Sequence, residues 1–159
     1  MRGFSLVEIL VAVAVLLVSF VSVLTAFQVA TRQGRASVLE VQAAALAEEG
    51  VEAVTTIRDA GWANLSSLAV GTPYDLIFTG TQWATTLSPQ TIDGSFRRSV
   101  TVGEVYRRNS DKDIVVADSP DPKAIDTGTK KITVRVAWAT STPNARERVM
   151  EAYLTNLFE

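Results

Sequence analysis

The chain has 159 residues, 20% of them charged, with a formal net charge of −2 and neither cysteine nor histidine. This composition excludes disulfides, thiolate metal sites, cysteine nucleophiles and every imidazole-based catalytic arrangement, including the Ser-His-Asp triad. The near balance of 15 basic and 17 acidic residues provides no excess of positive charge that would favour nucleic acid as a general partner.

The first predicted element is a helix across an apolar block, residues 4–27, whose single charged residue is Glu8. At about 1.5 Å per residue this helix is roughly 36 Å long, more than the roughly 30 Å hydrocarbon core of a bilayer. The block is longer than the apolar region of about 7–15 residues in a secretory signal, and no convincing small-residue cleavage site follows it. We therefore expect a retained, single membrane span with Arg2 and the N-terminus on the cytoplasmic side.

Glu8 requires an explanation, because a carboxylate at the centre of a membrane helix costs about 2.5–3.5 kcal/mol on insertion scales. Its position near the start of the block lowers that cost, and a glutamate there also complements the helix dipole. Glu8 is therefore either an interfacial residue that stabilises the helix or a carboxylate that awaits a positively charged partner.

The segment Gly3-Phe4-Ser5-Leu6-Val7-Glu8, after a short basic leader and before the long apolar run, resembles the class III signal of type IV pilins and type II secretion pseudopilins. The resemblance implies a leader at residues 1–3, cleavage by prepilin peptidase between Gly3 and Phe4, and N-methylation of Phe4. It also implies that Glu8, the fifth residue of the processed chain, pairs with the new amine inside a filament. Desolvation there strengthens the attraction between the two charges.

The resemblance implies a structural subunit that polymerises through its N-terminal helix into a type IV pilus or a type II secretion pseudopilus, which serve motility, adhesion, DNA uptake or protein secretion. Expected partners are prepilin peptidase, an inner-membrane assembly platform, other pilins or pseudopilins, and further copies of the chain. The precursor is expected in the inner membrane and the assembled subunit outside the cytoplasm. Residues 42–52 resemble the corresponding stretch of minor pilins and of the I-type minor pseudopilin. The alternative function is a minor recognition subunit whose head binds DNA, a surface or a secreted substrate.

Helical periodicity continues through residues 28–60, the predicted soluble half of the helix. Apolar or small residues recur at three- and four-residue steps, at Leu39, Ala43, Leu46, Gly50, Val54 and Ile57. This stripe predicts that the second half of the helix packs on another element. We expect Gly61 to end the helix in the left-handed cap conformation.

Residues 61–159 are predicted to form a β-sheet head, because the apolar period changes to two at residues 97–102 and 132–138. Asp93-Gly94 predicts a turn before the first of these strands. We expect residues 111–129 to form a polar loop around a short strand at 114–116. Residues 147–158 fit either a helix or a closing strand, and we favour the strand. The predicted fold is therefore α+β, a long helix packed by its second half on an antiparallel sheet, which is also the lollipop-shaped fold that the resemblance implies.

Oxygen ligands for calcium are candidates in the polar loop, where Asp111 and Asp113 alternate along the chain and Asp118 follows. The loop lacks the glycine and the bidentate glutamate of a calcium-binding loop, and Lys112 lies between the first two acids. A solvated polar loop is the alternative, and we expect no other cofactor.

Three basic pairs could form a stripe for DNA together with Trp83 and Tyr106, namely Arg97-Arg98, Arg107-Arg108 and Lys130-Lys131. Adjacent residues of a strand point to opposite faces, so each pair contributes one charge to a given face. Nucleic acid is therefore a weaker candidate partner than other protein subunits.

Charge order along the long helix suggests contacts between subunits, because a basic region precedes an acidic one. Arg32 and Arg35 of one copy could face Glu48, Glu49 and Glu52 of another, which would set the register of a filament. We expect no catalytic activity, because nothing in the sequence places two of the sheet-region carboxylates Asp75, Asp93 and Glu104 together.

Overall fold

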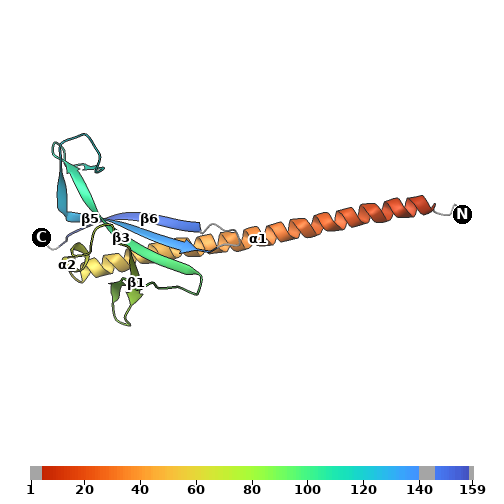
Figure 1. The fold of residues 1–159 in the computed structure, drawn as a ribbon, viewed down its shortest axis with the longest axis horizontal. Helices are drawn as coiled ribbons and strands as arrows, with labels where there is room; N and C mark the ends of the chain where they lie inside the picture. Colours follow the sequence, from red (N-terminus) through yellow and green to blue (C-terminus); the bar gives the residue numbers. More distant parts are fainter. Residues whose placement is uncertain (1–4, 140–145, 158–159) are drawn as a thin grey trace. The chain divides into compact units, whose positions relative to one another are not determined.

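Residues Leu6–Asp59 form one uninterrupted helix, α1, as the apolar block and the stripe predicted (Figure 1). The structure is a computed structural model that describes residues 5–139 and 146–157. The helix ends before Gly61, which has φ 152° and ψ 129°. Gly61 therefore has a positive φ, but the predicted left-handed helical conformation is wrong.

Contacts divide the chain into two compact units, Met1–Leu39 and Glu40–Glu159, and α1 contributes to both. In the first unit no described residue of α1 is buried. The second unit contains the C-terminal part of α1, the short helix α2 (Trp62–Ser66) and every described strand.

All strand pairs are antiparallel, and the sheet has the order β2-β1-β3-β5-β6, with β4 paired to β3 outside this path. The strands are β1 (Tyr74–Phe78), β2 (Trp83–Thr86), β3 (Phe96–Arg108), β4 (Ile114–Val115), β5 (Lys123–Trp138) and β6 (Arg146–Thr155). Strand β6 confirms the strand that we favoured near the C-terminus. Asp93 and Gly94 both have positive φ, 50° and 67°, in the tight turn predicted before β3.

The core of the second unit lies between α1 and one face of the sheet. The helix contributes a stripe of mostly small buried residues: Ala43, Ala47, Gly50, Ala53, Val54 and Ile57. The sheet contributes cross-strand pairs that include Val100 with Val134 and Val102 with Ile132, all buried. Figure 1 shows β3, β5 and β6 alongside this part of α1. Four of the six residues of the predicted stripe are therefore buried, whereas Leu39 and Leu46 are only partly buried. The small residues of the stripe bring the helix backbone close to the sheet.

A β-bulge between Glu104 and Val105 divides β3 into two parts, because it shifts the register with β5. Beyond the bulge, residues 105–108 pair with residues 123–126, and Figure 1 shows these ends of β3 and β5 bent away from the rest of the sheet. The predicted loop at 111–129 is therefore wrong from residue 123 onward, although the short strand within it is present as β4. The polar composition hid a strand that forms by pairing with β3.

Gly50 lies in close contact with the sheet, so we expect Gly50→Ala to destabilise the head. An added Cβ would lie 2.7 Å from Val134 Cγ1 and 3.0 Å from Arg98 Cδ. Overpacking of this kind costs about 1–3 kcal/mol. Denaturant unfolding of the full chain in detergent, followed by tryptophan fluorescence, measures the change.

Gly34→Ala is the matched control, because nothing lies within 4 Å of an added Cβ on the same helix. Alanine raises helix propensity by up to about 1 kcal/mol, so this variant should leave the stability of the head unchanged or raised. Equal destabilisation by both substitutions would contradict the close contact at Gly50.

Candidate functional site

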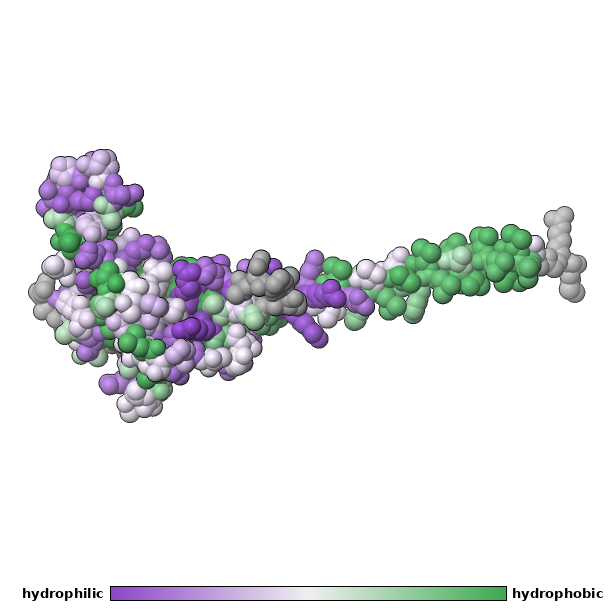
Figure 2. Space-filling view, viewed as in Figure 1, coloured by the Kyte–Doolittle hydropathy of each residue, from purple (hydrophilic) through white to green (hydrophobic). Residues whose placement is uncertain are grey.

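The N-terminal part of α1 exposes an almost wholly apolar surface, which Figure 2 shows as the green segment of the helix. Large apolar side chains such as Leu16, Val18 and Phe27 are 68–71% exposed. Among the described residues, α1 is the one helix long and apolar enough to cross a membrane. Exposure of this surface to water is unfavourable, so lipid or other apolar helices would have to cover it.

Hydroxyl groups within this apolar segment are bonded inside the helix. The Ser19, Ser22 and Thr25 hydroxyls each donate to the carbonyl oxygen four residues earlier, at 2.8 Å. These bonds leave few unsatisfied polar groups on the surface of the segment, which suits an apolar environment.

Glu8 lies in the first turn of α1 and is the single charged residue between residues 5 and 27. Its carboxylate complements the N-terminal end of the helix dipole. No basic side chain among the described residues forms an ion pair with it. Gly3 and Phe4, the predicted cleavage and methylation site, lie outside the described residues.

The predicted subunit-contact charges on α1 have different surroundings. Arg32 and Arg35 are exposed in the first unit, and Glu48 and Glu52 are exposed in the second. None of these four has an ion pair within the described parts of the chain. Glu49 instead pairs with Arg98, with 3.3 Å between Oε1 and Nη1, so it is the least available of the acids for another subunit.

Arg98 is buried, with its side chain 4% exposed, because β3 alternation places it on the face of the apolar residues that pack on α1. Its Nη1 donates to the carbonyl oxygen of Leu46 at 3.1 Å, and its Nη2 donates to Glu49 at 3.4 Å. The guanidinium also lies over the Trp83 ring, 5.2 Å from the centroid. Arg98 therefore connects α1, β3 and β2.

The other basic residues of the predicted DNA stripe mostly have acidic partners. Arg97 pairs with the buried carboxylate of Asp75, and Lys131 pairs with Glu151 at 2.8 Å, which raises the pKa of Lys131. Arg107 and Arg108, beyond the bulge, also pair with acids. Arg98 is buried, and the acidic partners of the other residues offset much of the positive charge of the stripe. DNA binding by these residues stays a prediction.

Arg108 lies between two acids of the predicted calcium loop. Its Nη1 is 2.6 Å from Asp111 and its Nε is 2.9 Å from Asp121. The backbone N–H of Asp113 and the Arg108 guanidinium lower the pKa of Asp111. Of the three calcium candidates, Asp111 therefore already has a cation, and no group of three acidic side chains suitable for a metal occurs among the described residues. Calcium binding at Asp111, Asp113 and Asp118 stays a prediction.

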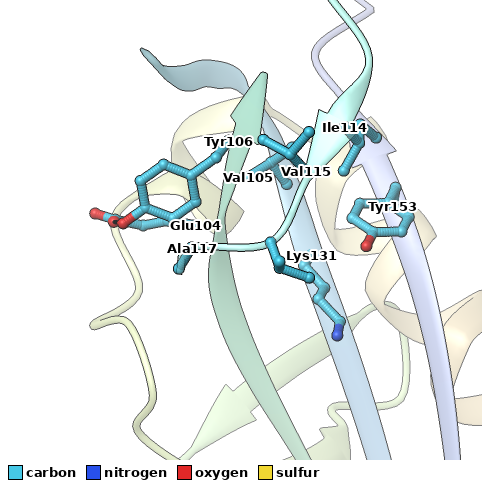
Figure 3. Close-up of a pocket in the computed structure, with 9 residues that line it drawn as sticks. Glu104, Val105, Tyr106, Ile114, Val115, Ala117, Lys131 and Tyr153 are labelled. Carbon is cyan, nitrogen blue, oxygen red and sulfur yellow. Dashed lines mark hydrogen bonds between the residues drawn. The ribbon is translucent and has the colours of Figure 1, made fainter. Parts of the chain in front are cut away.

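A cavity of about 300 Å³ lies beside the bulge, with side chains from β3 to β6 around it (Figure 3). Two groups at its wall are already paired: the Tyr106 hydroxyl donates to Glu104 at 2.8 Å, and Lys131 pairs with Glu151. The bond to Glu104 stabilises the protonated phenol and raises the pKa of Tyr106. Both of these polar groups therefore already have a partner within the described part of the wall.

A second groove, of about 350 Å³, follows β2 and is lined by the end of α1, by α2 and by the segment after it. The sequence analysis missed this groove because it depends on which strand forms the edge of the sheet. The sequence does contain one signal of an uncharged surface here, because residues 76–92 include no charged residue.

No protein-family model, curated protein or solved structure matches this chain.

Replacement of Arg98 tests whether it connects the helix to the sheet. We expect Arg98→Ala to lower the free energy of unfolding by about 2–4 kcal/mol, because it removes packed methylenes and charge-assisted hydrogen bonds. Denaturant unfolding of the full chain in detergent measures this change. Glu49 is 46% exposed, so Glu49→Gln should cost at most about 1 kcal/mol. The exposed Arg148→Ala is the control, and an Arg98→Ala chain as stable as this control would contradict the assignment.

The ion pair between Arg107 and Asp126 predicts a pH dependence. The hydrogen bond from Arg107 lowers the pKa of Asp126 below its ordinary value of 3.8. Because the folded-state pKa is lowered, the stabilisation is present above the unfolded pKa and is lost as the pH falls through the folded pKa. Arg107→Gln should raise the pKa of Asp126 and reduce this loss in acid. A carboxyl ¹³C NMR titration measures the pKa of Asp126 in both chains. Arg148→Gln is the control and should leave this pKa unchanged.

Proposed function

We propose that this chain is a pilin-like structural subunit, processed by prepilin peptidase and polymerised through α1 into a type IV pilus or a type II secretion pseudopilus. The observation that carries the proposal is the exposed apolar surface of α1, with Glu8 as its single charge between residues 5 and 27. The resemblance of residues 3–8 to a prepilin signal adds to it.

The apolar surface suits two environments in succession. In the membrane, lipid covers the helix, and in a filament, the apolar helices of neighbouring subunits replace the lipid. Association of helices from lipid gains no hydrophobic driving force, so packing and polar contacts must favour the filament. The pair between Glu8 and the amine of Phe4 from another copy supplies such a contact in a desolvated setting.

Charges farther along α1 would set the axial position of neighbouring copies. In this proposal, Arg32 and Arg35 of one copy face Glu48 and Glu52 of another. Because Glu49 is used by Arg98, Glu48 and Glu52 are the acids that carry this contact. Exposed pairs of this kind determine register more than affinity.

A recognition role for the head is the second candidate function, favoured by the groove along β2. Its lining residues are uncharged, which suits a protein segment better than a polyanion. Such a subunit would still assemble through α1.

Glu8→Gln tests the assembly role. We expect it to lower recovery of the subunit in sheared filaments by about tenfold or more, which corresponds to about 1.4 kcal/mol lost at the Glu8 contact. The host would supply prepilin peptidase and an assembly platform, and immunoblots of sheared and cellular fractions would measure incorporation.

Glu40→Gln is the control on the same helix and should assemble normally. By intact mass, both variants should lose Met1–Gly3 and gain one methyl group, which shows that membrane insertion and processing are intact. A wild-type chain that keeps its leader would contradict the processing step. Normal incorporation of Glu8→Gln would contradict the role of Glu8.

A further inference from the structure

The two edges of the sheet differ in charge. Edge strand β6 carries four charged residues: Arg146, Glu147, Arg148 and Glu151. The opposite edge, β2, lies within residues 76–92, which carry none. Because charged side chains on an edge discourage pairing with another chain, β6 is protected and β2 is not.

The backbone of β2 presents hydrogen-bonding groups at this edge. Thr79 N–H donates to the Gln82 carbonyl oxygen at 2.9 Å, so the backbone of Gln82 faces β1. Every second residue after Gln82 faces β1 in the same way, which makes Ala84 and Thr86 the bonded residues of β2. In an antiparallel pair, bonded residues alternate with residues whose N–H and C=O point away. Trp83 and Thr85 therefore direct their backbone groups to the free edge, and the described residues form no hydrogen bond with those groups.

The groove of about 350 Å³ runs along this edge. Its β2 side consists of Gln82 and the first three residues of β2, Trp83 to Thr85. Because the side chains of a strand alternate between the two faces of the sheet, four consecutive lining residues mean that the groove also contacts the backbone of β2. The opposite wall includes Ile57, Asn64 and Leu68, and none of the lining residues that the structure describes is charged.

Trp83 holds the edge in place from the side of α1. Its ring contacts Phe78, with 5.4 Å between centroids, and the buried Arg98 guanidinium lies over it. An edge strand held in this way loses little conformational entropy when it accepts a partner.

We infer that β2 accepts an extended, uncharged segment of another protein as an additional strand, with alternate side chains of that segment in the groove. Backbone hydrogen bonds to Trp83 and Thr85 provide affinity, and the groove provides selectivity, as in other cases of strand addition. The partner is uncharged because the groove offers no charge to pair with a buried one. The inference holds whether or not the chain forms filaments, because β2 and the groove lie in the second compact unit.

The experiment uses the full chain in detergent micelles and a capped peptide of alternating threonine and valine as the probe. At a peptide concentration about ten times its dissociation constant, amide exchange of Trp83 and Thr85 should slow by about tenfold, with no change at the amides of β6. Hydrogen exchange followed by NMR measures it. The same peptide, N-methylated at alternate residues on its pairing edge, should not bind.

Thr85→Pro removes the outward N–H without removing a bond of the ladder to β1. It should weaken peptide binding by about tenfold, equivalent to about 1.4 kcal/mol. Val149→Pro is the matched control, because Val149 occupies the corresponding outward position of β6, and it should leave peptide binding unchanged.

Three results would overturn the inference. These are unchanged exchange at Trp83 and Thr85, equal binding of the N-methylated peptide to the unaltered chain, and self-association of the chain that Thr85→Pro abolishes. The last result would assign the edge to a second copy. The N-methylated peptide keeps the test decisive even if Thr85→Pro does not fold.

Discussion

The close approach of α1 to the sheet at Gly50 is the constraint on which the head depends. Small residues along one stripe allow the helix backbone to come within reach of β3 and β5, and a Cβ at Gly50 would overlap Val134. The same proximity lets the buried Arg98 reach the carbonyl oxygen of Leu46. A carbonyl, a carboxylate and an aromatic face offset the burial of the guanidinium, although its Nε has no hydrogen-bond partner among the described residues.

Arg98 relates the helix to the edge of the sheet. By lying between Glu49 and Trp83, it connects the helix to β2, the strand that borders the uncharged groove. Removal of Arg98 would therefore alter both the stability of the head and the surface that we infer binds a peptide. Glu49 takes part in this internal contact, which leaves Glu48 and Glu52 for the proposed contacts with other subunits.

The head and the N-terminal helix bury apolar surface in different ways. Within the second unit, apolar residues of α1 and the sheet cover one another. In the first unit nearly all apolar side chains of α1 are exposed within the described part of the chain, so their free energy depends on lipid or on other helices. In the proposed filament, Glu8 would give that otherwise nonspecific surface a defined partner.

Local patterns of the sequence by themselves determined the long helix, most of its buried stripe, the alternating parts of β3 and β5, and the turn at Asp93. Spacing of apolar residues and backbone preference are local properties. Only the tertiary structure decided that Lys123–Thr129 is a strand, that Arg98 is buried against Glu49, and that β2 is an uncharged edge beside a groove. These features arise from pairing between residues far apart in the chain. The polar composition around residue 123 does not show that β3 pairs with this segment. The alternation around residue 98 does not show which groups stabilise a buried arginine.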